Sequence, residues 1–85
     1  MMVKQGDRVR WTSQSQGYWT TKEGVVLAIV PAGKDVTSYI PDGTPPSRIK
    51  GQRVSKIDRV LVEVKGRTVS NYYCPRINQV EIVED

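Results

Sequence analysis

The sequence predicts a single all-β domain, built as a small five-stranded barrel with a long loop between its second and third strands. Short segments of alternating or continuous apolar residues are each bounded by glycine or proline, which is typical of strands and turns. No segment has helical periodicity over more than one turn, and 85 residues suffice for one small domain. The strands are expected near residues 7–12, 24–30, 58–65, 67–74 and 80–83.

The first strand follows the turn Gly6-Asp7 and alternates, with Val9 and Trp11 on one face. A polar arm, residues 13–17, comes next and carries no periodicity. It ends in two large aromatic residues, Tyr18 and Trp19. We expect the arm to be the exposed loop of the first hairpin.

The segment 22–24, Lys-Glu-Gly, is expected to be a turn that opens the most apolar strand of the chain, residues 25–30. Its β-branched residues and its flanking Gly24 and Pro31 favour a strand over a buried helix. This should be the central strand of the domain.

Residues 31–56 form the predicted loop, which holds four of the five prolines and three glycines. Its few apolar residues leave little to bury, so we expect the loop to be mobile, with a short edge strand possible at 36–40. It is also basic: between Arg48 and Arg59 there are five cations and a single acid, Asp58.

Residues 59–65 alternate cleanly, with Val60, Val62 and Val64 on the core face and Leu61 on the opposite one. Gly66 is expected to supply the positive φ of a tight hairpin turn. Pro75 ends the fourth strand, and a single turn at 76–78 leads into the last one. The predicted core is Val9, Trp11, Val25, Leu27, Ile29, Val60, Val62, Val64 and Ile82, with the facing of the second strand open to reversal.

Two turn glycines and a Gly-Val second strand, at Gly6, Gly24 and Val25, resemble the KOW motif of ribosomal and transcription-elongation proteins. The order of strands and loops is likewise similar to that of SH3-like barrels. Small barrels of these families bind RNA, DNA or peptides through their loops. The resemblance therefore implies a binding module and covers under a third of the chain.

The composition points to a basic protein without catalytic chemistry. Thirteen Lys and Arg against nine Asp and Glu give a net charge of +4 and a pI near 9.5, which favours polyanionic partners. The chain has no histidine, and its one cysteine, Cys74, is expected to be a buried apolar residue. We expect no enzyme activity, no catalytic residue, no metal site and no cofactor.

The same composition sets expectations for location and assembly. No apolar run approaches the roughly 18 residues of a membrane span, and no signal peptide is evident. A single cysteine allows no internal disulfide, which favours a reducing compartment. We expect a cytoplasmic monomer that does not associate with membranes.

Basic and aromatic residues together carry the functional hypothesis, which is weak, backbone-directed binding of RNA or single-stranded DNA. Cations neutralise phosphates, and exposed aromatic rings stack on unpaired bases. The candidate residues are Arg8, Arg10, Tyr18, Trp19, Lys22, Arg48, Lys50 and Arg53.

Two alternatives stay open at this stage. The aromatic residues Tyr18, Trp19, Tyr72 and Tyr73 could line a peptide groove or a methyl-lysine cage, as in SH3 and Tudor domains. The chain could also be an accessory subunit that docks on a protein partner through the loop 31–56.

Overall fold

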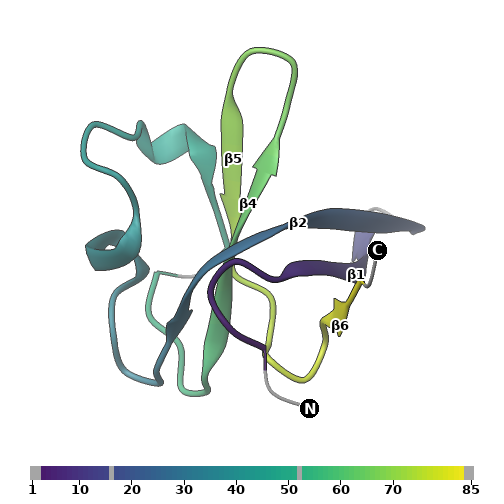
Figure 1. The fold of residues 1–85 in the computed structure, drawn as a ribbon, viewed down its shortest axis with the longest axis horizontal. Coiled ribbons are helices and arrows are strands. Elements are labelled where there is room, and N and C mark those ends of the chain that lie inside the picture. Colours follow the sequence, from purple (N-terminus) through teal and green to yellow (C-terminus); the bar gives the residue numbers. More distant parts are fainter. Residues whose placement is uncertain (1–2, 16, 52, 84–85) are drawn as a thin grey trace.

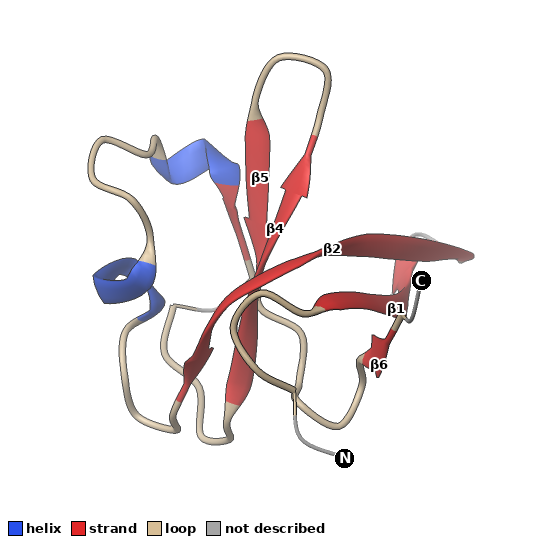
Figure 2. Ribbon diagram, viewed as in Figure 1, coloured by secondary structure: helices blue, strands red, loops and turns tan. Residues whose placement is uncertain are grey.

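The computed structural model describes residues 3–15, 17–51 and 53–83. In this part of the chain the regular structure consists of strands and two short 3₁₀ helices (Figures 1 and 2). The strands are β1 (Arg8–Ser15), β2 (Tyr18–Val30), β3 (Ile49–Lys50), β4 (Arg59–Lys65), β5 (Ser70–Tyr73) and β6 (Glu81–Ile82). The 3₁₀ helices are η1 (Val36–Tyr39) and η2 (Pro46–Arg48).

These strands form one mixed sheet in the order β3-β5-β4-β2-β1-β6. All neighbours are antiparallel except β3 and β5, which run parallel. The all-β prediction is therefore confirmed. The sheet is open, because β3 and β6 lie at its two ends, so the closed five-stranded barrel is not confirmed.

The hairpin of β1 and β2 is longer than the sequence indicated. Its register runs without interruption from Arg8 opposite Val25 to Ser15 opposite Tyr18. The predicted turn at 22–24 is wrong, since these residues lie inside β2. Gly24 is required there by packing: a Cβ at this position would lie 2.7 Å from Cγ1 of Val62, closer than real side chains approach.

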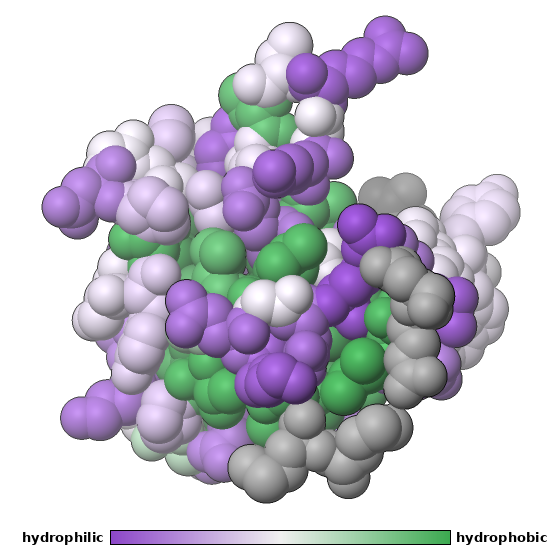
Figure 3. Space-filling model, in the orientation of Figure 1, coloured by the Kyte–Doolittle hydropathy of each residue, from purple (hydrophilic) through white to green (hydrophobic). Residues whose placement is uncertain are grey.

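The first apolar cluster lies between the β1–β2 hairpin and β4. Val9, Trp11, Val60 and Val62 are buried in it, as predicted, together with Val26. Val3 completes the buried set. Around them pack Ile29, Val64, Tyr73, Ile77, Val80 and Ile82. Apolar surface stays visible between polar side chains in Figure 3, as expected for a domain of this size.

The predicted facing of β2 is wrong at its centre. Val26 is buried, whereas the side chain of Val25 is 36% exposed. The pairing of β2 with β4 shifts between Val26 and Ala28, and such a bulge turns the following side chains to the other face. Leu27 alternates with Val26 and packs in a second cluster. Beyond the bulge Ile29 contacts the first cluster and Val30 is buried in the second.

This second cluster lies on the other face of β4, beneath the segment 31–56. Leu61, expected on the solvent face, is fully buried there. The other buried members are Val30, Val36, Ile40, Tyr72 and Cys74. The segment 31–56 covers one face of the sheet, and β4 is buried on both sides.

Within the segment 31–56 the chain is held by caps and backbone hydrogen bonds. The Asp35 carboxylate accepts from the N–H and the hydroxyl of Thr37, at 2.9 and 2.7 Å. Val36 N–H donates to the Arg53 carbonyl at 2.8 Å. The expectation that this segment has little to pack is wrong, and residues 36–39 form η1 instead of an edge strand.

The β4–β5 hairpin exists, but its turn differs from the predicted one. Residues 66–69 connect Lys65 to Ser70, and Gly66 N–H donates to the Val69 carbonyl at 2.8 Å. Gly66 does not have a positive φ. A Cβ there would lie 2.8 Å from the Val69 oxygen, so close backbone approach explains this glycine.

Candidate nucleic-acid interface

The β1–β2 hairpin has two faces with different chemistry. Paired residues of antiparallel strands share a face, and successive residues alternate. The register therefore places Tyr18, Thr20 and Lys22 on the face of Trp11 and Ser13, which leads into the first apolar cluster. We call this the inner face; the outer face carries Arg8, Arg10, Trp19, Thr21 and Glu23.

Acidic neighbours balance the cations of the outer face. Arg8 lies 4.0 Å from a carboxylate oxygen of Glu23, and Arg10 lies 3.5 Å from one of Glu81. Such exposed pairs contribute little to stability, but they cancel much of the local positive charge. The outer face is thus poorer in net positive charge than the sequence indicated.

On the inner face, Lys22 is held in place by neighbours from two strands. Its ammonium group donates to the Ser13 hydroxyl at 3.0 Å and lies 5.5 Å from the centre of the Tyr73 ring. Tyr73 in turn packs edge-on against Trp11, with ring centres 5.8 Å apart. The Lys22 ammonium group is therefore held over the face of the Tyr73 ring.

A second lysine reaches the same place from the segment 31–56. Strand β3 pairs in parallel with β5, which sets Lys50 directly beside Tyr73. Lys22, Lys50 and Tyr73 line a shallow hollow of about 210 Å³, which we call the two-lysine hollow. The remaining lining residues are Trp11, Ser13, Gly51, Cys74, Pro75 and Gln79.

The two-lysine hollow differs from the other cavities among the described residues in its charge. No aspartate or glutamate lines it, whereas each of the four others has a carboxylate from Glu23, Asp42, Glu63 or Glu81. Two ammonium groups without a carboxylate between them attract anions. Of these five cavities, the two-lysine hollow therefore favours an anion most.

The remaining predicted cations lie elsewhere. Arg48 lines a separate cavity with Asp42 and Tyr72, and Arg53 lines a third one near η1. Arg53 also helps to keep the pKa of Asp35 below its ordinary value, although hydrogen bonds from Thr37 contribute more. The basic loop therefore does not form one continuous cationic surface.

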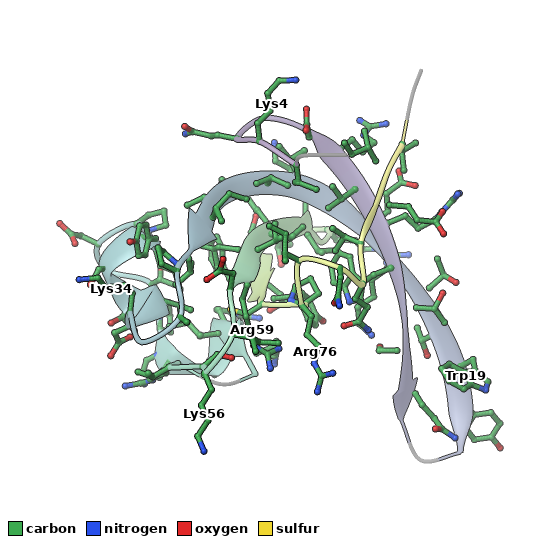
Figure 4. The ribbon with its side chains drawn as sticks, turned by 90° about the horizontal axis from the view of Figure 1, so that it is seen from below. Lys4, Trp19, Lys34, Lys56, Arg59 and Arg76 are labelled. Carbon is green, nitrogen blue, oxygen red and sulfur yellow. The ribbon has the colours of Figure 1, made fainter. Side chains whose placement is uncertain are left out.

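The aromatic pair at the hairpin tip is exposed, with 76% of Tyr18 and 70% of Trp19 accessible. Figure 4 shows Trp19 at the far end of the arm, away from the body of the domain. Tyr18 lies on the inner face and Trp19 on the outer one. Tyr72 is buried in the second cluster and Tyr73 contacts the first, so the four rings do not converge on one cage.

The sequence analysis missed two residues of the two-lysine hollow. Ser13 and Gln79 line it, and the Gln79 amide donates to the Thr12 carbonyl at 3.0 Å across 67 positions. No local pattern marks these residues, because their neighbours come from distant segments.

The remaining chemistry of the described residues concerns potential metal ligands and the one thiol. No group of three potential metal ligands occurs there. Burial raises the pKa of the Cys74 thiol above its ordinary value, which keeps it protonated and unreactive. No helix in the described part of the chain is long and apolar enough to cross a membrane.

Comparison with known proteins identifies no matching family model, curated protein or solved structure. The resemblance to KOW and SH3-like domains stays a prediction from the residues quoted above.

Proposed function

We propose that the protein binds single-stranded nucleic acid, RNA or DNA, weakly and through its sugar–phosphate backbone. The observation that carries this proposal is the two-lysine hollow, which Lys22 and Lys50 both line and which has no lining carboxylate. A nucleic-acid strand carries one phosphate group per nucleotide, so a single ligand offers an anion to each lysine of this basic protein. The binding surface is the inner face of the β1–β2 hairpin together with β3.

Each residue of this surface has a distinct role in the proposal. Lys22 and Lys50 contact phosphate oxygens as point charges. Ser13 and Gln79 supply further hydrogen-bonding groups at the rim. Tyr18, on the same face and mostly exposed, offers its ring to an unpaired base, which contributes about 1–3 kcal/mol when stacked.

The salt dependence of binding tests the electrostatic part of the proposal. Two or three phosphate contacts on a single strand give a log–log slope of about −1.4 to −2.1. Affinity should then fall about 7- to 18-fold between roughly 50 and 200 mM salt. This decrease in affinity is smaller than four or more phosphate contacts would give. Fewer contacts are expected because Arg8 and Arg10 already have acidic neighbours.

Fluorescence anisotropy with labelled, mixed-sequence RNA and single-stranded DNA measures this directly. Lys50→Ala should weaken binding to both, whereas Lys34→Ala, an exposed lysine away from the hollow, should not. Tyr18→Ala and Trp19→Ala form a second matched pair, because both rings are exposed at one tip on opposite faces. Only Tyr18→Ala should weaken binding, by about 5- to 160-fold.

Two results would overturn the proposal. One is no binding near 50 mM salt at tens of micromolar protein, a range in which weak non-specific complexes are detectable. The other is that each test variant and its control change the affinity for nucleic acid equally.

A protein-binding role is the second candidate, and the exposed pair Tyr18 and Trp19 favours it. Tyrosine and tryptophan are enriched among the residues that dominate protein interfaces. In that case Tyr18→Ala and Trp19→Ala would weaken binding to a protein partner equally. Docking through residues 31–56 has less support, because Val36 and Ile40 are turned into the second cluster.

We also propose that the sheet is a variant of the SH3-like arrangement that the sequence resembles. Strand β2 supports this, since it pairs with β1 along its whole first half and with β4 from Val25 to Val30. One long strand thus joins two parts of the sheet. An experimental structure in which the end strands β3 and β6 pair would establish closure of the barrel.

A further inference from the structure

The outer edge of the β1–β2 hairpin arm is a strand edge without a neighbour. Strand β4 pairs with β2 only from Val25 onward. Among the described residues, nothing pairs with the opposite side of β2 between Tyr18 and Gly24. Figure 1 shows this part of β2 extending as an arm away from β4 and β5.

Two backbone hydrogen bonds of Val26 define which backbone groups face this edge. Val26 donates to the Asp7 carbonyl and accepts from Gly6 N–H, both at 2.8 Å, so its backbone groups point toward β1. Directions alternate along a strand. The N–H and C=O groups of Trp19, Thr21 and Glu23 therefore point outward, to the unpaired edge.

This edge has only part of the usual protection against strand addition. Natural edge strands are shielded by charged side chains, especially lysine, by proline, by a bulge or by a covering loop. Of these devices the edge has only the charges of Lys22 and Glu23. Residues 18–23 contain no proline, and their register with β1 has no bulge. Thr20 and Thr21 are β-branched and favour extended pairing.

The edge is also complementary to itself. In an antiparallel pair centred on Thr20, Trp19 lies opposite Thr21 of the second copy, and Tyr18 lies opposite Lys22 of the second copy. The tyrosine ring and the ammonium group attract each other, and no like charges oppose each other. Two-fold antiparallel pairing uses the same residues on both chains, as closed dimers require.

We propose that two copies of this chain associate through the β2 edge, residues 18–23, as an antiparallel strand pair about Thr20. The two-fold axis is perpendicular to the joined sheets, so both inner faces lie on one side. This inference shares Tyr18 and Lys22 with the proposed nucleic-acid binding, but its evidence is the unpaired edge and its tests need no nucleic acid. The sequence led us to expect a monomer, and the unpaired edge is the reason to revise that expectation.

Cross-linking at the two-fold axis tests the register. Thr20 of each copy would form a non-hydrogen-bonded pair, whose Cα atoms lie about 4.5 Å apart, within disulfide range. Thr20→Cys should form a covalent dimer under mild oxidation at least about tenfold faster than Thr12→Cys. Thr12 is a matched control on β1, exposed and on the same hairpin; Cys74 is buried and does not compete.

Light scattering tests association through the β2 edge without an introduced cysteine. The mass should rise from 9.6 kDa toward twice that value between about 10 µM and 1 mM, since a small interface gives weak association. Thr21→Pro removes an outward N–H and should abolish the rise, whereas Gln14→Pro, whose N–H faces the other edge of the hairpin, should not. Near-ultraviolet circular dichroism verifies that both variants are folded.

A mass of one chain at all concentrations, with equal cross-linking rates for Thr20→Cys and Thr12→Cys, would overturn the proposal. A dimer that Thr21→Pro leaves intact would overturn it as well, because that dimer would use another surface. If Thr21→Pro unfolds the hairpin, the comparison of the two cysteine variants decides alone. Loss of nucleic-acid binding leaves all these readouts unchanged, so the two proposals fail separately.

Discussion

Leu61→Ala is the sharpest test of the second apolar cluster. From the alternation along β4 alone, this side chain faces solvent, whereas the structure buries it completely beneath the segment 31–56. Val25 is the matched control, because alternation places it in the core and the structure exposes 36% of it. The sequence pattern and the structure thus predict opposite rankings for the two substitutions.

The expected magnitude follows from the burial of Leu61. Replacing a fully buried leucine by alanine costs about 2.7–5 kcal/mol, the loss growing with the cavity that remains. At about 0.05–0.15 kcal/mol per residue, a chain of 85 residues has roughly 4–13 kcal/mol of unfolding free energy in total. Leu61→Ala should therefore remove a large share of the stability, while Val25→Ala should cost less than about 0.5–1 kcal/mol.

Urea denaturation followed by tryptophan fluorescence measures both variants. Trp11 is buried in the first cluster and reports unfolding, whereas Trp19 is already exposed. With a slope near 1 kcal/mol per molar urea, the Leu61→Ala midpoint should fall by about 3 M. In heat the loss corresponds to a Tm lower by about 12–24 °C.

Equal midpoints for Leu61→Ala and Val25→Ala would refute the second cluster. Val36→Ala extends the test to the segment 31–56 itself. Val36 packs in the cluster of Leu61, so the double variant should lose less than the two single losses combined, by at least about 0.5 kcal/mol. Strict additivity would show that the segment does not cover β4.

Three further predictions concern the core and the cysteine. Val62→Asp should leave the domain unfolded by circular dichroism, because it buries a charge without a partner in the first cluster. Gly24→Ala should lower the urea midpoint by about 1–3 M, since the new Cβ meets Val62 and the backbone of Glu63; Thr20→Ala, exposed on the same strand, should not. Cys74 has a raised pKa in the folded state, so its contribution to stability is complete below its ordinary value of 9.0 and declines as the pH rises above it. Cys74→Ser should flatten that alkaline decline in urea titrations between about pH 8 and 10.5, and an unchanged decline would contradict the assignment.

Much of the strand content could be predicted from the sequence, because it depends on local patterns. The alternation of Val9 and Trp11 and of Val60 and Val62 set those side chains on the core face, and the structure buries all four. Glycine or proline residues close to at least one end marked the segments that became β1, β4 and β5. Cys74 was likewise recognisable as a buried residue from its chemistry alone.

Only the tertiary structure decided the facing of β2 and the fate of residues 31–56. A one-residue shift between Val26 and Ala28 reverses every later side chain, and such a bulge leaves no mark in a continuous apolar run. The few apolar residues of the segment 31–56 suffice to cover Leu61, because the second face of β4 supplies the rest of the cluster. The composition of the segment 31–56 does not show that the second face of β4 is available to complete the cluster.

The candidate site divides in the same way. The sequence alone determined which residue types are present: cations, exposed aromatic residues, and no histidine. The tertiary structure decided their grouping, since the parallel pairing of β3 with β5 brings Lys50 to Lys22 over Tyr73. It also placed Glu23 and Glu81 beside Arg8 and Arg10. Electrostatic character depends on distances between residues far apart in the chain, and those distances exist only once the sheet has formed.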